Sequence, residues 1–426
     1  MSHILSKRYS ATQTTGNHGG LQVRVADTNI ALPIDHATVE VFGVDKDGKE
    51  TLVDVLTTDS SGLTQTIQLN APPIEFSLQP QSEVRPYSTY NVRVSANGFN
   101  SVRIEGVEIF DTETALQEID LVHQVQPAPR STIIPLPDNN LWVPGEPKIP
   151  ESEVKPLPEQ TGFVVLDLVV IPEFIVVHAG RPDAYATNYW VPFKDYIKNV
   201  ASSEIYSTWP VETLRANVLA ILSFTLNRVF TEWYRGQGKN FTITNSTAFD
   251  QAFTYGRTIY TSISNVVDEL FTNYITRQGI MQPLFTQYCD GKTVHCPKWL
   301  SQWGSAQLGE QGVGYLDILR NYYGDIYIDK APIVSGVPVS YPGFTLRPGM
   351  SGESVRTIQN QLNVISNNYP AIKKLRTDGV YGPLTAESVK TFQQIFNMPQ
   401  TGVVDMATWY KISHIYVAVS RLATLV

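Results

Sequence analysis

Asp378–Thr385 reads DGVYGPLT, and apolar residues follow it at positions 389 and 392, at helical spacing. An earlier stretch, Leu346–Gly352 (LRPGMSG), precedes apolar residues at 355, 358 and 362 in the same way. Glycines suit the tight turn before each helix, and Thr385 is placed to cap the second one. A third block, Gly402–Asp405, ends near Trp409. The pattern predicts a three-helix bundle over residues 344–426.

This segment resembles the peptidoglycan-binding domain type 1 family, whose motif positions it matches almost throughout from 346 to 409. The resemblance implies three helices that present a groove to the glycan and peptide of a bacterial cell wall. The residues that we expect to contribute to wall binding are Arg347, Asp378, Tyr381, Thr385, Gln393 and Trp409.

The middle of the chain, residues 161–330, predicts an α+β, mainly α domain. A β-rich apolar run at 163–177 comes first, and helical spacing then predicts a helix over 191–203. Pro210 stands at the first turn of the next helix. Glu204 therefore lies at the end of one helix, just before a break in the chain. Near aromatic Tyr206 and Trp209, its carboxyl can sit in an apolar, sugar-stacking cleft.

Burial in such a cleft raises the pKa of a carboxyl group, as a general acid requires. Glycan hydrolysis needs a second acid or base, and the same loop contains none. A single acid fits a lytic transglycosylase, in which the muramyl C6 hydroxyl is the nucleophile. Read by itself, a glutamate at a helix end is far more often a cap or a surface group.

The stretch around Glu204 resembles the stage II sporulation protein D family, whose catalytic glutamate it matches. Val200, Trp209, Glu212 and Leu214–Ala216 hold motif positions, and a second block starts at Ser301–Ser305 (SQWGS). The chain departs from the family at Ile205 and at Ile221–Leu222. The resemblance covers roughly 170–328. It implies that Glu204 is the acid/base and that substrate is bound by Tyr206, Trp209, Arg215, Ser301, Gln302, Trp303 and Gly304.

The two cysteines, Cys289 and Cys296, lie between these blocks, and His295 adjoins the second. Members of that family can hold a structural zinc here, but adjacent His295 and Cys296 are awkward ligands for one metal. A local disulfide or free thiols are equally compatible with the sequence. No cofactor is otherwise indicated.

Residues 21–123 alternate apolar and polar side chains between Asp, Gly and Asn turns, which predicts an all-β sandwich. The segment is similar to transthyretin-like modules, a likeness of fold that implies no chemistry. Residues 1–20 read as a flexible tail without a secretory signal. No apolar stretch is long enough to predict a membrane span, and a net charge of −8 gives no case for nucleic acid.

Nine of the 27 prolines lie within residues 124–160, which predicts an extended, exposed and protease-accessible linker. A shorter linker is predicted at 331–343. The domain order resembles the clostridial spore cortex-lytic enzymes. That resemblance implies a zymogen of the spore's cortex or coat region, with a pro-domain at 21–123 that covers the glycan groove or assists folding. A subtilisin-like germination protease of the Csp type would cut the linker.

The expected substrate is then spore cortex peptidoglycan, which contains muramic-δ-lactam, and the expected activity is that of a lytic transglycosylase. Two alternatives stay open. One is a hydrolase of the same wall, a muramidase or an N-acetylglucosaminidase, and the other is a non-catalytic wall-binding scaffold.

Overall fold

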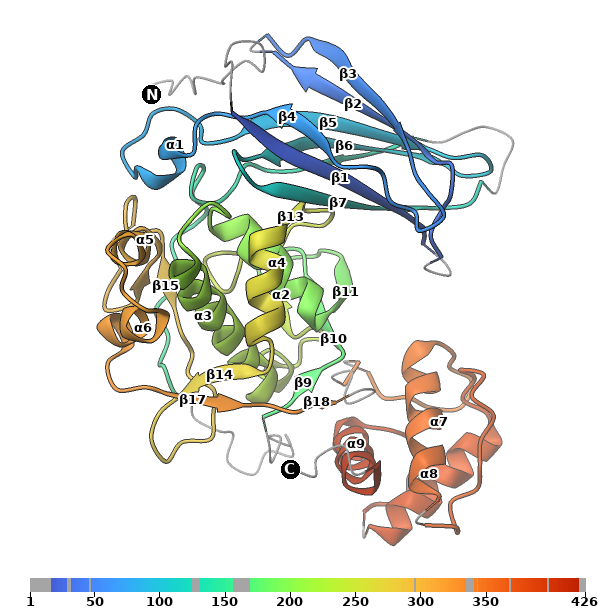
Figure 1. Cartoon of the computed structure of the whole chain (residues 1–426). Helices are drawn as coiled ribbons and strands as arrows, with labels where there is room; N and C mark the ends of the chain where they lie inside the picture. Colours follow the sequence, from blue (N-terminus) through green and yellow to red (C-terminus); the bar gives the residue numbers. More distant parts are fainter. Residues whose placement is uncertain are drawn as a thin grey trace.

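The computed structural model describes residues 17–28, 32–45, 47–124, 131–155, 169–294, 296–334, 341–342, 344–367, 369–396 and 398–420. The described chain has a β-rich N-terminal region, a middle region rich in helices and a C-terminal helical domain (Figure 1). The order expected from the sequence, a β-rich region followed by helices in the middle and at the C-terminus, is confirmed at this level.

Two sheets form the N-terminal region. One has the order β3-β2-β5-β6-β8 and the other the order β13-β7-β1-β4. Alternate residues of β1, such as Leu21, Val23 and Val25, are fully buried, because a strand turns every second side chain to the same face. The strands are β1 His18–Asp27, β2 Thr38–Val44, β3 Glu50–Thr57, β4 Ile67–Asn70, β5 Ser88–Ser95, β6 Ser101–Ile109, β7 Thr114–Leu121 and β8 Ser131–Pro135, and a short helix α1 spans Glu75–Leu78.

The N-terminal and middle regions share one continuous hydrophobic core. Strand β13 (Ile259–Tyr260) of the middle region pairs with β7 and completes the four-stranded sheet. The ring of Phe110 lies 5.5 Å from that of Tyr206 and 5.3 Å from that of Tyr260, between centroids. The apolar pattern at 21–123 could not reveal this sharing, because it shows which residues are buried but not what covers them.

Helix α3 (Val211–Phe230) is buried along nearly its whole length at the centre of the middle region. The other helices around it are α2 Phe193–Glu204, α4 Thr261–Leu270, α5 Gln302–Glu310 and α6 Tyr315–Tyr323 (Figure 1). Short strands complete the region: β9 Ile171–Pro172, β10 Phe174–His178, β11 Asn188–Pro192, β12 Ile243–Thr244, β14 Asn273–Thr276, β15 Tyr288–Cys289, β16 Leu300–Ser301, β17 Tyr327–Lys330 and β18 Ile333–Val334, with a 3-10 turn η1 at Arg235–Gln237.

Most of residues 131–155 in the predicted linker are exposed, but the segment is bound to the folded protein. Strand β8 pairs in parallel with β6, and beyond it Asn139, Leu141 and Lys155 are buried. Proline removes its own N–H only, so a proline-rich chain can still bind through its other backbone groups. The flanking residues 125–130 and 156–160, where the predicted cleavage can also fall, lie outside the described residues.

Two smaller boundaries also differ from the sequence-based predictions. The predicted tail 1–20 is wrong at its end, because His18 begins strand β1 and pairs with Asn70. The predicted linker 331–343 includes β18, which pairs with β9, while residues 335–340 and 343 lie outside the described part of the chain.

Three helices form the C-terminal domain around a core of its own: α7 Glu353–Ile365, α8 Pro383–Ile395 and α9 Met406–Ser420. The expected cap is not Thr385. Helix α8 starts at Pro383 with Gly382 as its N-cap, because proline fits the first helical position. Among the described residues, no helix has the length and apolar character that crossing a membrane requires.

Candidate functional site

Glu204 is the last residue of α2, and its side chain is buried, with only 1% of the residue exposed. The chain turns to an extended conformation at Ile205, where the helix ends. Oε1 accepts a hydrogen bond of 2.7 Å from the backbone N–H of Ala252. Oε2 has no hydrogen-bond partner in the described chain. One carboxyl oxygen is thus fixed and the other is available.

The Glu204 carboxyl lies against a small cavity of about 30 Å³. Its walls come from five parts of the chain and are lined by Asn140, Pro144, Gly145, Glu146, Pro147, Lys148, Glu204, Thr247, Tyr288, Cys289, Asp290, Val294 and Gln302. Burial raises the pKa of Glu204, and the positive charge of Lys148 opposes that shift, as do Tyr288 and Ala252. A carboxyl of this kind holds its proton to a higher pH than a solvated one does.

Lys148 is the cation whose charge acts on the Glu204 carboxyl. Its Nζ atom lies 4.5 Å from the centre of the Tyr288 ring and donates a hydrogen bond to the Asp250 carbonyl. Burial lowers the pKa of Lys148, and the charges of Glu204 and Asp250 oppose that change. Sequence reasoning missed both Lys148 and Tyr288, which lie far from Glu204 in the chain and carry no local motif.

Of the predicted substrate-binding residues, Gln302 reaches the cavity. It lines the cavity wall, and its Nε2 donates to the Glu204 carbonyl at 3.3 Å. Asp290 lines the same cavity, and its oxygens accept hydrogen bonds from the N–H groups of Thr293 at 2.7 Å and Val294 at 2.9 Å. Sequence reasoning missed this second acid because it lies outside the Glu204 loop.

The predicted sugar-stacking aromatics Tyr206, Trp209 and Trp303 form a buried cluster instead of an open cleft. The Trp209 ring lies 5.7 Å from Tyr206 and 5.1 Å from Trp303, and none of the three residues is more than 5% exposed. The indole N–H of Trp209 donates to the Ser77 carbonyl of α1 at 2.9 Å. The N-terminal region thus covers rings that the sequence alone suggested were open to sugar.

The three other predicted substrate-binding residues make contacts within the chain. Arg215 pairs with Glu269 at 2.9 Å. Ser301 caps α5 by accepting the N–H of Gly304 at 3.0 Å. A Cβ at Gly304 would lie 2.2 Å from the Tyr322 hydroxyl, so glycine permits the close approach of α5 and α6.

The structure joins Cys289 and Cys296 in a disulfide. The sequence left a zinc site, a disulfide and free thiols open for these two cysteines, and the structure has the disulfide. Cysteines in a disulfide have no thiolate with which to bind zinc. His295 lies outside the described residues. Within the described residues, no group of three or more His, Cys, Asp or Glu side chains is placed to hold a metal ion.

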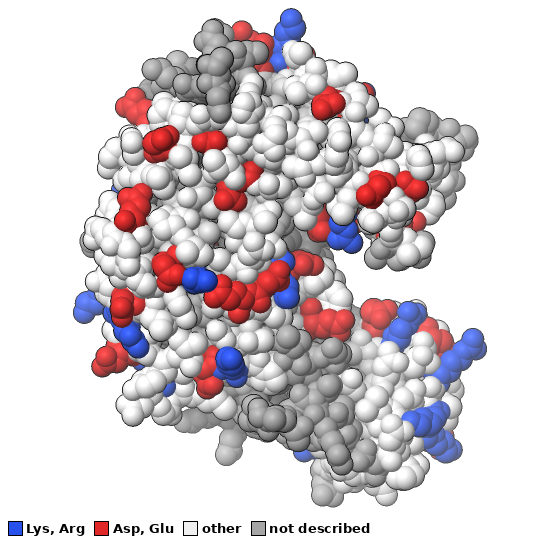
Figure 2. All heavy atoms as spheres, viewed as in Figure 1, with Lys and Arg blue, Asp and Glu red and all other residues white. Residues whose placement is uncertain are grey.

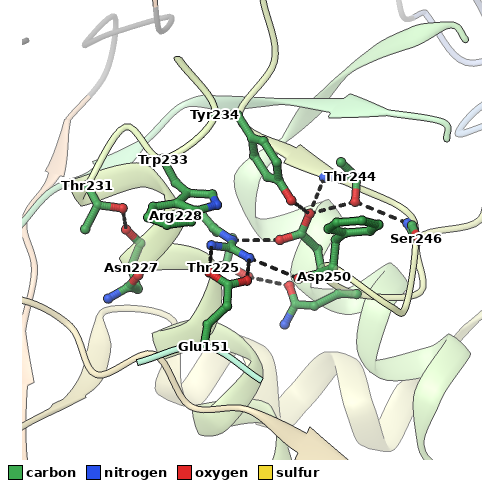
Figure 3. Close-up of polar contacts among 12 residues, drawn as sticks. Glu151, Thr225, Asn227, Arg228, Thr231, Trp233, Tyr234, Thr244, Ser246 and Asp250 are labelled. Carbon is green, nitrogen blue, oxygen red and sulfur yellow. Dashed lines mark hydrogen bonds and ion pairs between the residues drawn. The ribbon is translucent and has the colours of Figure 1, made fainter. Parts of the chain in front are cut away.

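A buried ionic network joins the segment that carries Glu151 to Arg228 of α3 (Figure 3). Arg228 of α3 is fully buried and donates to Asp250 at 2.7 Å and to Glu151 at 2.7 Å. Asp250 also accepts the hydroxyl of Tyr234 at 2.7 Å. Buried charges need such paired, hydrogen-bonded arrangements to be tolerated.

In the C-terminal domain, most of the predicted wall-binding residues build the fold. Tyr381, Thr385, Gln393 and Trp409 are buried, whereas Arg347 and Asp378 are exposed. Gln393 accepts the N–H of Gly402 at 2.9 Å, and Gln359 accepts that of Gly379 at 2.9 Å. The two glutamines fix the two glycine turns that the sequence pattern had emphasised.

The charge is distributed unevenly over the visible surface. Figure 2 shows acidic side chains across the N-terminal and middle regions, and Lys and Arg side chains gathered along the outer side of the C-terminal domain. Contact between wall glycan and the exposed residues of the C-terminal domain stays a prediction.

Solved structures that are similar to parts of this chain include the SleB N-terminal domain, with 26% identity over 17% of this chain and 93% of that one and a TM-score of 0.15. The Bacillus anthracis TIE protein has 15% identity over 25% of this chain and 17% of its own, with a TM-score of 0.17. The 3-chlorocatechol 1,2-dioxygenase from Rhodococcus opacus 1CP has 12% identity over 28% of this chain and 64% of its own, with a TM-score of 0.18. These low TM-scores carry no conclusion about this chain's fold or function.

No curated protein matches the chain. Residues 351–412 match the family model of a putative peptidoglycan binding domain, and this match points to a function at the cell wall.

Proposed function

We propose that the chain is the precursor of a spore cortex-lytic enzyme of the clostridial type, a lytic transglycosylase with Glu204 as its acid and base. The observation that carries the proposal is the buried Glu204 carboxyl, with one oxygen fixed by Ala252 and the other without a partner. The match of residues 351–412 to a wall-binding family supports peptidoglycan as the substrate.

In this mechanism Glu204 takes the proton of the muramyl C6 hydroxyl and gives a proton to the glycosidic oxygen that leaves. The C6 oxygen bonds to C1 as the bond from C1 to the leaving oxygen breaks, so the product is a 1,6-anhydro sugar and no water is consumed. The raised pKa of Glu204 supports this role, because an acid that holds its proton to a higher pH than a solvated carboxyl is better suited to donate to a sugar oxygen.

Cell-wall hydrolysis is the second candidate, and one observation favours it. Asp290 lines the same cavity as Glu204, and a glycoside hydrolase uses two carboxyl groups. The loop N–H groups of Thr293 and Val294 occupy the Asp290 carboxylate. Both oxygens of Asp290 are thus engaged by its own loop, and for this reason we prefer the single-acid mechanism.

The experiment compares the activated wild-type protein with Glu204→Gln and Asp290→Asn on purified spore cortex. Mass spectrometry of the released fragments separates the mechanisms, since a transglycosylase leaves 1,6-anhydro-muramyl ends and a hydrolase leaves reducing ends. We expect anhydro ends from the wild type and from Asp290→Asn, and no fragments from Glu204→Gln. Reducing ends, or loss of activity in Asp290→Asn with Glu204→Gln active, would favour the hydrolase. Binding without cleavage by activated wild-type protein would favour the scaffold.

The location and the partners are part of the same proposal. Cortex that contains muramic-δ-lactam would be the substrate in the spore, and a subtilisin-like Csp protease would activate the precursor. Amino-terminal sequencing of the mature protein from germinating spores tests the activation step.

A further inference from the structure

A second cavity, here called the junction pocket, lies where the N-terminal region meets the middle region. Its volume of about 310 Å³ falls in the range of ligand sites, whereas the Glu204 cavity measures about 30 Å³. One side is formed by β6, β7 and β8, and the other by β11, the start of α2 and residues 253–259. Among the described residues, none lines both cavities, so the junction pocket is separate from the Glu204 site.

Two aromatic side chains on the middle-region side of the junction pocket are open to solvent. Trp190 of β11 is 48% exposed and Tyr255 is 51% exposed. The Tyr255 ring is held by stacking on Tyr189, with 5.0 Å between the ring centres and 18° between the planes. Large aromatic rings left open beside a cavity mark a binding surface, and a fixed flat ring suits the apolar C–H face of a sugar.

Two carboxyl groups in the lining have no partner among the described residues. Asp120 lies on β7 and Asp195 in the first turn of α2, and neither makes an ion pair or a hydrogen bond with a described side chain. Partial burial raises the pKa of both, the charge of Glu118 adds to the shift, and Arg24 opposes it. Carboxylate oxygens in this situation are strong acceptors that a ligand can use.

The lining of the junction pocket also carries hydrogen-bond donors. Lys198 lines it and pairs with Asp268 at 3.1 Å. Arg257 is buried, and its Nη1 lies 3.4 Å from Glu108 Oε1 without completing a hydrogen bond in the described chain. An organic cation could use the acceptors alone and would meet these positive charges. A neutral ligand with many hydroxyl groups can use donors and acceptors together, so the lining favours a saccharide.

Trp190 also lines a larger hollow, of about 890 Å³, between the middle region and the C-terminal domain. The C-terminal side of that hollow includes Glu353, Thr357 and Asn360 of helix α7, within the segment 351–412 that matches the peptidoglycan binding model. Figure 2 shows the surface indented between the N-terminal region and the C-terminal domain. The Trp190 indole thus lies between the junction pocket and the wall-binding domain, an arrangement that suits a linear chain of sugars.

We propose that the junction pocket binds a stretch of linear glycan, with Trp190 and Tyr255 stacking on sugar rings and Asp120 and Asp195 accepting hydrogen bonds from sugar hydroxyls. Both the N-terminal and the middle regions contribute to this site, so it belongs to the intact chain. The intact chain then has a glycan contact besides its C-terminal domain. This site goes beyond the proposed chemistry of Glu204 and does not depend on it.

The test uses the full, uncut protein and chitotetraose, a neutral tetramer of N-acetylglucosamine. A photoreactive diazirine at the reducing end of the tetramer crosslinks it to nearby residues, and mass spectrometry identifies the labelled peptides. We expect labelled peptides from residues 116–120 or 190–199, apart from any in the segment 351–412. An excess of plain chitotetraose should suppress this labelling, and titration of its suppression gives the affinity of the junction pocket.

Substitutions in the junction pocket should weaken this binding selectively. We expect a loss of about tenfold in affinity for Trp190→Ala and of about fivefold for Tyr255→Ala and for Asp195→Ala. Tyr327→Ala is the matched control for Tyr255→Ala, because Tyr327 is 49% exposed and lies outside the junction pocket, and it should leave the affinity unchanged. Equal urea unfolding curves confirm that the variants are folded.

Crosslinks confined to residues 351–412, or unchanged labelling in both Trp190→Ala and Tyr255→Ala, contradict the proposal. The fully de-N-acetylated tetramer, which is cationic in mildly acidic buffer, tests the role of charge. If this tetramer binds and chitotetraose does not, the pocket takes a cation and the saccharide assignment fails. Crosslinks at the junction pocket together with an inactive protein on cortex uphold the pocket and overturn the proposed function of Glu204. Cleavage of cortex without such crosslinks has the opposite meaning.

Discussion

Replacing Asp250 by asparagine probes the buried network in which Arg228 pairs with Asp250 and Glu151. The Asp250 side chain is fully buried and accepts hydrogen bonds from Arg228 at 2.7 Å, Tyr234 at 2.7 Å and the Thr244 hydroxyl at 2.6 Å. Asparagine keeps the size of the side chain and removes its charge. Arg228 would then be left with Glu151 as its only carboxylate partner in the described chain.

The magnitude follows from the burial of the two charges. Removing one partner of a fully buried ion pair costs about 3–5 kcal/mol in the free energy of unfolding. We expect the lower part of that range for Asp250→Asn, since Glu151 still binds Arg228. The matched variant Glu151→Gln should cost about 1–2 kcal/mol, because its side chain is 17% exposed and Arg228 retains Asp250.

Urea unfolding at pH 7, followed by tryptophan fluorescence, measures both variants against the wild type. Trp233 packs on this network, with the Arg228 guanidinium 5.2 Å from its ring centre, so its emission reports the region. A loss below about 1 kcal/mol for Asp250→Asn, or a greater loss for Glu151→Gln than for Asp250→Asn, would refute the reasoning.

Two further predictions concern stability elsewhere in the chain. Burial raises the pKa of Glu113 from 4.5 to about 7, so its stabilising contribution is present below pH 4.5 and is lost as the pH rises to 7. Glu113→Gln should remove about 1–3 kcal/mol of pH dependence over that interval, seen by urea unfolding at pH 4.5 and 8; identical pH profiles would contradict this assignment. In the C-terminal domain, Gln393→Ala should lower the free energy of unfolding by about 1–3 kcal/mol, because it leaves the buried N–H of Gly402 without its acceptor. The control Gln394→Ala, at the exposed neighbouring position, should change it little, and equal losses would argue against a structural role for Gln393.

Local patterns revealed the elements of the fold but not their association. The glycine turns and apolar spacing of residues 344–426 were enough to predict three helices, because both are signals within a few residues. The break after Glu204 was likewise predictable from Pro210. The shared core of the N-terminal and middle regions was not, since Phe110 and Tyr260 are ordinary buried aromatics until the chain is folded.

The candidate site, like the fold, was predictable where its signals are local in the sequence and not where distant residues meet. Glu204 lies at a helix end as expected, but its neighbours Lys148 and Tyr288 are 56 and 84 residues away in the chain, from the difference in their numbers. Proline density predicted an extended, exposed segment, but it could not show that residues 139–155 are bound. That depends on amides such as Gln287, which no pattern around the prolines identifies.

The most direct test of the central claim is the analysis of fragments released from purified cortex by the activated protein and by its Glu204→Gln variant. Glutamine preserves the size of the side chain and the acceptor for the Ala252 N–H, so folding and sedimentation with cortex should be unchanged. The account predicts 1,6-anhydro-muramyl ends from the activated wild-type protein and a rate of their release at least about 100-fold lower from the variant. Release at the wild-type rate by Glu204→Gln would contradict it.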